Sequence, residues 1–265
     1  MCGHAFAVVV LVLAACGERV PSREPLAKPE AGQLRVMSYN VNFGIGGDPA
    51  GVRAVGSSNA DIVFLQETNA EWERAFVDAL GRRYPHHQFT DPPDWPAGGM
   101  GVLSRFPIVS IDTLPSHGGY FFAWRIVIDG PLGRMQVLNV HLRPPMSDGG
   151  SYVVGFFSTR DDRLREIEYH LATLDPALPT LIVGDFNEER DGLAMKRLAA
   201  IGYHDAVAQF RGTQPTWSWP VSSAVTLRFQ LDHLLYDDRW IAARAHIVDG
   251  GRSDHKPIWV DLERD

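Results

Sequence analysis

Cysteine is nearly absent from this 265-residue sequence, since Cys2 and Cys16 are its only two. Both lie in the first sixteen residues, so a cysteine metal site or a disulfide framework in the rest of the chain is excluded. Long hydrophobic runs are absent too. The most apolar stretch, residues 5–15, has only about half of the ~20 residues that a membrane-spanning helix needs.

Positively charged residues are fewer than negatively charged ones. Lys and Arg number 25 against 32 Asp and Glu, which gives a formal net charge of −7. Tight, non-specific wrapping of nucleic acid depends on many clustered cations, so this balance argues against it without excluding a nuclease. With 45% hydrophobic residues and no Pro-, Gly- or Ser-rich linker in its middle, the chain has the composition of one packed domain.

Several common catalytic motifs are missing. The sequence has no His-Glu-x-x-His motif for zinc and no Gly-x-Ser-x-Gly turn for a serine hydrolase. It also lacks a P-loop and the Gly-x-Gly-x-x-Gly fingerprint of dinucleotide-binding folds. The chemistry must therefore come from the oxygen and imidazole groups that the chain does contain.

The first sixteen residues resemble the signal of a bacterial lipoprotein. Residues 5–15 are apolar throughout and end in Leu13-Ala14-Ala15-Cys16, which is similar to a lipobox. The resemblance implies a signal peptide over residues 1–15, a lipidated Cys16, and a solvated tether over residues 16–32. We therefore expect an exported lipoprotein anchored in a membrane, in the bacterial outer membrane or at the cell surface, with no obligate protein partner. Because no Lys or Arg precedes the apolar stretch, the alternatives are a plain secretory signal or a wrongly assigned start codon.

From residue 34 onward, short apolar runs end in polar residues. Runs of this length indicate strands that are buried on both faces, and ligands in such folds gather beyond the strand ends. We expect the polar side chains that close, begin or precede these runs to converge on one rim, and they are Asn40, Glu67, His141, Asp185, Asp232, Asp254 and His255.

Helices are expected between some of these strands. Asn69 or Thr68 caps a helix that runs to Leu80, a second helix covers roughly residues 159–174, and a third lies near residues 192–200. The second helix has an apolar stripe, and we expect its charged residues to face water: Arg163, Arg165, Glu166 and Glu168.

One pair of strands reads as antiparallel. Residues 129–133 have the sequence Asp-Gly-Pro-Leu-Gly and separate two apolar runs, which predicts a hairpin. Strands outnumber helices, so a doubly wound parallel sheet fits poorly. The fold class is therefore α/β, with two packed mixed sheets flanked by helices, in a single domain over residues 33–265.

The candidate site is rich in oxygen. It contains four carboxylates, two amides and two imidazoles, from Glu67, Asp185, Asp232, Asp254, Asn40, Asn187, His141 and His255. Oxygen ligands suit a hard divalent ion, so Mg²⁺ or Mn²⁺ is the expected cofactor and zinc is not. The residues alone thus favour metal-assisted hydrolysis.

The same residues lie in short motifs that resemble the endonuclease/exonuclease/phosphatase superfamily. In order along the chain they are Ser38-Tyr39-Asn40-Val41-Asn42, Gln66-Glu67-Thr68, Gly101-Val102-Leu103-Ser104-Arg105, Asn139-Val140-His141-Leu142, Gly184-Asp185-Phe186-Asn187, Leu231-Asp232-His233 and Ser253-Asp254-His255. The resemblance covers about residues 34–262. It implies a four-layer α/β sandwich that cleaves phosphoester bonds with a divalent metal.

The resemblance also implies roles for single residues. Glu67 would be the principal metal ligand, with Asn40 beside it and Asp254 completing or orienting the shell. Asp185 would position and deprotonate the attacking water, and Asn187 would donate to a phosphoryl oxygen. His255, held in one tautomer by Asp232, would contact the phosphate or the water, and His141 would be a second donor.

For several other polar and aromatic residues we expect a structural role rather than a place in the site. We expect His86, His87 and His204 at the surface and His233 on the opposite side of its strand from Asp232. For Arg105, Arg125 and Arg143, contact with phosphate and an ordinary solvated or ion-paired position are both left open. Trp217 and Trp219 are expected to pack in a loop, although stacking on a base or contact with lipid is the alternative.

The expected substrate is a phosphate ester. Nucleic acid or a nucleotide is the leading class, and a phospholipid-type phosphodiester is a close second, although the sequence has no clear hydrophobic insertion hairpin. Phosphomonoesters come third. The alternative of another kind is a non-catalytic surface lipoprotein that has kept the fold.

Overall fold

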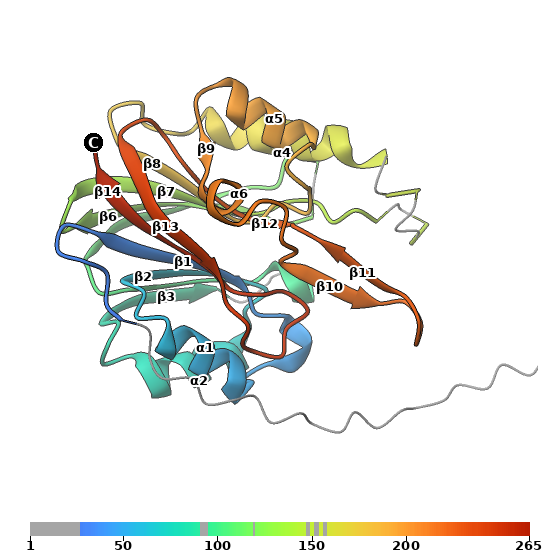
Figure 1. Ribbon diagram of the computed structural model, residues 1–265, viewed down its shortest axis with the longest axis horizontal. Helices are drawn as coiled ribbons and strands as arrows, with labels where there is room; N and C mark the ends of the chain where they lie inside the picture. The colour runs from blue at the N-terminus through green and yellow to red at the C-terminus, as the bar shows by residue number, and fades with distance from the viewer. Residues whose placement is uncertain (1–26, 91–94, 119, 147–148, 151–153, 156–157) are drawn as a thin grey trace, which may run out of the picture.

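Two six-stranded mixed β-sheets lie face to face at the centre of the protein (Figure 1). The computed structural model describes residues 27–90, 95–118, 120–146, 149–150, 154–155 and 158–265. The expected signal peptide and most of the tether therefore lie outside the described residues. In the described ranges, no helix is both long and apolar enough to cross a bilayer.

The two sheets have different strand orders. The first consists of β13 (Trp240–Ile247), β14 (Ile258–Arg264), β1 (Leu34–Asn40), β2 (Ile62–Gln66), β4 (Met100–Ser104) and β3 (His86–Thr90). The second consists of β5 (Ile108–Leu114), β6 (Ala123–Gly130), β7 (Gly133–His141), β8 (Thr180–Asp185), β12 (Asp232–Tyr236) and β9 (His204–Asp205).

Helices cover the outer face of each sheet, which completes four layers (Figure 1). On the first sheet lie α1 (Pro49–Ser57) and α2 (Ala70–Leu80), and on the second α4 (Arg160–Leu171) and α5 (Leu193–Ala200). The short α6 (Ala206–Arg211) packs beside β12 and β13. Two 3₁₀ turns, Phe43–Ile45 and Pro96–Gly98, lie in the connections.

Side chains that alternate along the strands contribute to two hydrophobic clusters, one between the sheets and one under the helices. On β1, Val36 belongs to the cluster between the sheets, and Met37 belongs to the cluster under α1 and α2. All seven residues of β1 are buried, as expected of a strand that is covered on both faces. The α/β fold with two packed sheets and outer helices is therefore confirmed.

Local sequence signals located several elements correctly. Asn69 caps α2 by accepting hydrogen bonds from two backbone N–H groups, and Gly81 follows the helix as expected. The predicted hairpin is the antiparallel pair β6–β7, whose turn is Pro131 and Leu132. Helices α1 and α6 were not expected, and His86 and His87 lie in the edge strand β3 rather than in a loop.

The expectation that all the charges of α4 face water is wrong. Arg163 and Glu166 are buried, with exposed fractions of 1% and 0%. The Arg163 guanidinium donates to Glu188 Oε2 at 2.8 Å, and Glu166 Oε2 accepts from the backbone N–H of Arg143 at 2.9 Å. Their partners lie in loops far along the chain, so helical periodicity alone could not reveal them.

A third, two-stranded sheet projects from one end of the sandwich (Figure 1). It consists of β10 (Trp217–Pro220) and β11 (Thr226–Phe229), and we call it the ribbon. Its base is joined to the main body by an isolated bridge between Trp217 and His255.

The buried Glu166 makes stability depend on pH. Burial raises the pKa of Glu166 from 4.5 to about 7, against the lowering by its bond from the Arg143 N–H. Between these pH values the folded chain keeps the proton that the unfolded chain releases, so the free energy of unfolding falls by up to about 3 kcal/mol as pH rises. Urea titrations of Glu166→Gln at pH 4.5–8 should show that fall removed.

The matched control is Glu168→Gln, since Glu168 is exposed on the same helix. This control should retain the pH dependence of the unmodified chain. An unchanged profile in Glu166→Gln would contradict the assignment.

Candidate active site

Strand pairing brings the predicted polar residues to one edge of the sandwich. In the second sheet, β7 runs parallel to β8 with His141 opposite Asp185, and β12 runs antiparallel with Asp232 also opposite Asp185. In the first sheet, parallel pairing of β1 and β2 places Asn40 beside the end of β2, directly before Glu67. The expected rim of converging strand ends is therefore present.

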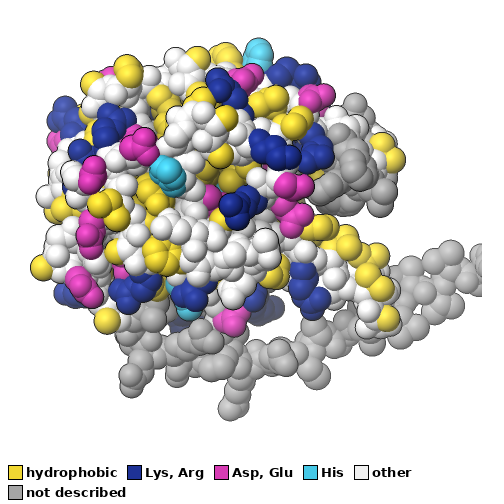
Figure 2. Space-filling model, turned by 45° about the horizontal axis from the view of Figure 1, so that its top comes forward, with side chains coloured by type: hydrophobic (Ala, Val, Ile, Leu, Met, Phe, Trp, Pro, Cys, Tyr) yellow, Lys and Arg dark blue, Asp and Glu magenta, His cyan; other side chains and the backbone are white. Residues whose placement is uncertain are grey.

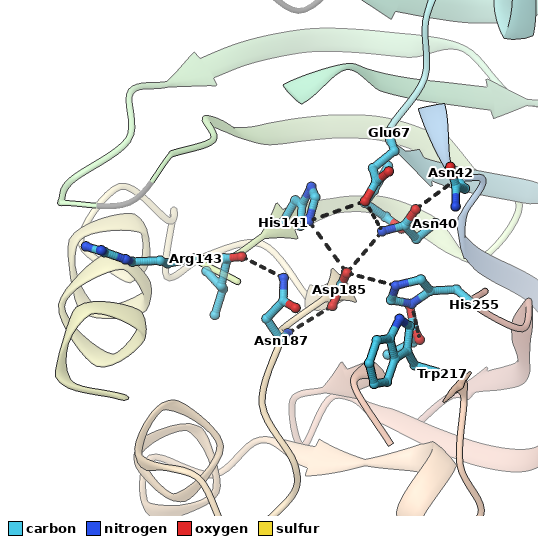
Figure 3. Close-up of polar contacts among 12 residues, drawn as sticks. Asn40, Asn42, Glu67, His141, Arg143, Asp185, Asn187, Trp217 and His255 are labelled. Carbon is cyan, nitrogen blue, oxygen red and sulfur yellow. Dashed lines mark hydrogen bonds and ion pairs between the residues drawn. The ribbon is translucent and has the colours of Figure 1, made fainter. Parts of the chain in front are cut away.

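Asp185 lies at the centre of this edge (Figure 3). Its Oδ2 accepts from Asn40 Nδ2 at 3.0 Å and lies 3.5 Å from both His141 Nε2 and His255 Nε2. Its Oδ1 accepts from the backbone N–H of Asn187 at 2.9 Å. Burial raises the pKa of Asp185, whereas the nearby imidazoles act to lower it. A buried carboxylate with a raised pKa is suited to accept a proton.

Gly184, the residue before Asp185, is required by the sheet itself. Its φ is 135°, and a Cβ atom at this position would lie 2.0 Å from the carbonyl oxygen of Val140. No side chain fits there without moving the neighbouring strand. The glycine thus permits β8 to run next to β7 up to the site.

His255 and Asp232 form a buried pair. His255 Nδ1 lies 2.9 Å from Asp232 Oδ2, so Nε2 is the nitrogen that faces Asp185. Burial alone would lower the pKa of His255, but the charges of Asp232 and Asp185 outweigh it and raise the pKa to about 10. At neutral pH the ring is therefore a cationic donor.

Glu67 and Asn40 form the second half of the site. Asn40 Nδ2 donates to Glu67 Oε1 at 2.9 Å as well as to Asp185, so it holds carboxylates from both sheets. The backbone N–H of Phe43 donates to Glu67 Oε2 at 3.2 Å. Burial raises the pKa of Glu67, and the bond from Asn40 opposes this rise.

Asp254 is held in place by two residues that were not expected in the site. Asn42 Nδ2 donates to Asp254 Oδ1, and Trp217 Nε1 donates to Asp254 Oδ2, both at 2.8 Å. Asn42 belongs to the motif that begins at Ser38. Its position two residues after Asn40 was the only signal in the sequence that it could lie in the site. Trp217 was expected to pack in a loop; it lies instead at the start of β10 and donates a hydrogen bond to an expected metal ligand.

His141 and Asn187 complete the group. His141 is stacked on Phe121 with ring centroids 4.0 Å apart, and burial lowers its pKa, so the imidazole is neutral. Asn187 Nδ2 donates to the carbonyl oxygen of Leu142 at 2.9 Å, which occupies one of its two N–H bonds. All eight residues predicted for the site thus lie within one connected group, and their roles stay predictions.

The polar group forms the floor of a cavity of about 720 Å³. Its walls are largely apolar and aromatic, and they include Phe43, Trp95, Phe121, Met146, Trp217, Trp219, Leu227 and Phe229. None of the described residues that line it is Lys or Arg, and the acidic ones are Glu67, Asp185 and Asp254.

The other histidines and arginines singled out in the sequence have different partners. His233 lies between Asp205 and the carbonyl oxygen of Glu188, on the far side of β12 from the cavity. His204 pairs with Asp238. The guanidinium groups of Arg105, Arg125 and Arg143 lie within 3.0 Å of Asp61, Asp112 and Asp162, respectively. Arg143 points away from Asp185 (Figure 3).

The donor set fits a hard divalent cation. The Glu67 and Asp185 carboxylates lie close enough to share the Asn40 amide group as a donor, and the described residues that line the cavity include no Lys or Arg to balance their charge. Asp185, Asp232 and His255 also place oxygen and nitrogen atoms within 4.8 Å of one another. A protonated His255 has no lone pair to give a metal ion, so the group that suits Mg²⁺ or Mn²⁺ is the oxygen-rich one around Glu67.

The pairing of His255 with Asp232 gives a direct prediction. Asp232→Asn removes the closest negative charge, so the pKa of His255 should fall by about one unit or more. An NMR titration of the ring protons in EDTA checks this, with the resonance assigned by its loss in His255→Gln.

Asp205→Asn is the matched control, because Asp205 contacts His233 Nδ1 at 2.7 Å in the same way. It should leave the titration of His255 unchanged. An equal shift in both variants would mean that Asp232 has no special role.

Comparisons with known proteins agree with this geometry. Residues 37–255 match the model of the Endonuclease/Exonuclease/phosphatase family. No curated protein matches the sequence. An endonuclease/exonuclease/phosphatase from Beutenbergia cavernae is similar in structure, with a TM-score of 0.67, 21% identity, and coverage of 88% of this chain and 72% of that one.

Two eukaryotic proteins have similar structures as well. The human Nocturnin catalytic domain with bound sulfate has a TM-score of 0.66 and 16% identity, over 89% of this chain and 96% of that one. TDP2 from D. rerio, complexed with a single-strand DNA product, has a TM-score of 0.63 and 16% identity, over 87% and 99%. These low identities concern the fold, whereas the family match covers most of the sequence. The chain thus belongs to the endonuclease/exonuclease/phosphatase family and has its phosphoesterase fold.

Proposed function

We propose that this protein is a divalent-metal-dependent phosphodiesterase. The observation that carries the proposal is the position of Asp185, whose one oxygen lies within 3.5 Å of Asn40, His141 and His255 at the floor of a cavity. A binding module has no need to bury a carboxylate against two imidazoles. A phosphodiesterase needs this arrangement, because it must activate water and stabilise negative charge in the same place.

The buried side chains have different roles in the proposed reaction. Asp185 accepts the proton of the attacking water, since burial raises its pKa. His255 is protonated and presents Nε2 to the phosphate, while Asp232 holds the other nitrogen. His141 and the remaining N–H of Asn187 donate to the phosphoryl oxygens.

Glu67, with Asn40 and Asp254 beside it, would hold Mg²⁺ or Mn²⁺. When bound, such an ion supplies positive charge against the phosphate and offsets the crowding of carboxylates. Asn42 and Trp217 are positioning residues for Asp254, because each donates to one of its oxygens.

Two substrate classes fit the proposed reaction. Single-stranded nucleic acid or a nucleotide is favoured by the shared fold with TDP2, whose structure contains a DNA product. A phospholipid-type phosphodiester is favoured by the apolar walls and by the lack of Lys and Arg among the described lining residues. Proteins that hold single strands combine aromatic platforms with a basic groove, and only the aromatic part is present in this lining.

Glu67→Gln tests the metal site. The substitution keeps the shape and removes one charge, so hydrolysis of bis-p-nitrophenyl phosphate should fall and be partly restored by raising Mg²⁺ or Mn²⁺. His255→Ala should instead lose roughly 10²- to 10⁴-fold in kcat/KM at every metal concentration, because no ion replaces the imidazole.

Glu73→Gln, which changes an exposed carboxylate on α2, is the control and should keep full activity. Each variant is first matched to the unmodified chain by its melting curve. If EDTA leaves the unmodified chain active, the metal assignment is wrong. If the unmodified chain hydrolyses no phosphodiester, the proposed activity is wrong.

We further propose that the protein is exported and held at a membrane by a lipidated Cys16. The support is the Leu13-Ala14-Ala15-Cys16 sequence and the charged tether that follows it. Cys16→Ser should move the protein from the detergent phase to the aqueous phase in a phase-partitioning experiment, with its specific activity retained. Continued partitioning of Cys16→Ser into detergent would contradict the anchor.

A further inference from the structure

The ribbon has one apolar face and one polar face. Its antiparallel register places Trp217 opposite Phe229 and Trp219 opposite Leu227. Because alternate residues of a strand point to the same side, these four side chains share one face. All four line the cavity, whereas the intervening residues Ser218, Pro220, Thr226 and Arg228 do not.

This apolar face extends from the polar group at the cavity floor to the tip of the ribbon. At the base, Trp217 stacks on Phe229 with ring centroids 6.0 Å apart and donates to Asp254. Farther out, Trp219 is 52% exposed and Leu227 37% exposed. Val221 and Val225 continue the exposed apolar surface in the turn, with exposed fractions of 59% and 51%. Figure 2 shows hydrophobic side chains in a row along this projecting arm.

The ribbon is built to remain in this position. The backbone N–H of Ser218 donates to the carbonyl oxygen of Asp254 at 3.0 Å, and that of Lys256 donates to the carbonyl oxygen of Thr216 at 2.6 Å. An isolated two-stranded hairpin is marginal in water, so these bonds to the segment that contains Asp254 and His255 fix its orientation. Whatever the apolar face contacts is therefore held beside Asp254 and His255.

We propose that the ribbon is the specificity element of this site and that it binds an uncharged, apolar substituent of the phosphodiester. Trp219, Leu227 and Phe229 are the specificity-determining residues. The inference rests on the proposed phosphodiesterase activity and adds the substrate class, a phosphodiester with an aliphatic or aryl group of several carbon atoms.

Two features decide between this class and a polyanion. A strand with many phosphates needs cations along its path, and the described cavity lining contains no Lys or Arg. The ribbon's own cation, Arg228, lies on the opposite face from the four apolar residues. A nucleobase would also leave its polar edge against Leu227 and Phe229, which offer no hydrogen bond from their side chains.

The first test measures binding and does not require turnover. Methyl- and hexylphosphonate are titrated into the full-length chain in Mn²⁺ by calorimetry, below the concentration at which the hexyl compound forms micelles. Hexylphosphonate should bind about tenfold or more tightly, since several methylenes leave water. Trp219→Ala and Leu227→Ala should bring the ratio of the two dissociation constants close to one.

Arg228→Gln is the matched control on the same ribbon. It should retain the preference for the hexyl compound, because its side chain lies on the other face. A preference that survives both Trp219→Ala and Leu227→Ala, or its loss in Arg228→Gln alone, would overturn the proposal. Equal binding of the two phosphonates by the unmodified chain would overturn it as well.

The second test uses hydrolysis to separate the possible substrates. The substrates are p-nitrophenyl phosphodiesters whose second substituent is methyl, hexyl or thymidine. We expect the hexyl compound to have the highest kcat/KM, and the two ribbon variants to lose mainly this advantage. Preference for the thymidine compound would show that the ribbon stacks a base and would overturn the apolar class.

The two proposals fail in different ways. Hydrolysis of all three compounds at equal rates would leave the phosphodiesterase intact and remove the specificity of the ribbon. Binding of hexylphosphonate without hydrolysis of any compound would leave the ribbon site intact and remove the proposed activity.

Discussion

The burial of one carboxylate, that of Asp185, is the constraint on which the rest of the site depends. A charged group in this position is costly unless it is paired and hydrogen-bonded. Its partners arrive from both sheets, because Asn40 ends β1 in one sheet and His141 ends β7 in the other. The position of one sheet relative to the other is therefore fixed by the contacts to Asp185 at this edge as well as by packing between the sheets.

The same edge stores backbone strain. Glu67 and Asn187 have φ values of 59° and 51°, in the left-handed region that residues with a side chain seldom adopt. Each such residue costs of order 1–3 kcal/mol and persists only where the surroundings hold it. Here the bonds from Asn40 to Glu67 and from Asn187 to the Leu142 carbonyl supply that support. Packing elsewhere in the sandwich offsets a site that is unfavourable by itself.

Sequence reasoning succeeded where the signal was local. Buried strands are short apolar runs, so the order of residues along the chain is enough to locate their ends, and with them Asn40, Asp185 and the rest of the polar group. It failed where the environment is made by distant segments. The helical pattern of α4 predicts that Arg163 is a surface charge. It is instead buried and paired with Glu188, which lies 25 residues away in the sequence. The ribbon was missed although its alternation is local, because each of its strands has only four residues and the first ends in Pro220, a pattern that is hard to tell from a loop.

Gly184 shows that one motif can carry two kinds of information. The glycine is dictated by the carbonyl oxygen of Val140, which would collide with any Cβ atom, so it reports the spacing of β7 and β8. Asp185, the next residue, has no such steric role, and in the proposed reaction its carboxylate accepts a proton. A descendant of this chain that lost its chemistry would still need the glycine to fold, and could exchange the carboxylate for a group that costs less to bury. In such chains, the aspartate of Gly-Asp-Phe-Asn should therefore indicate whether the proposed activity is kept. The glycine of the motif indicates only that the fold is kept.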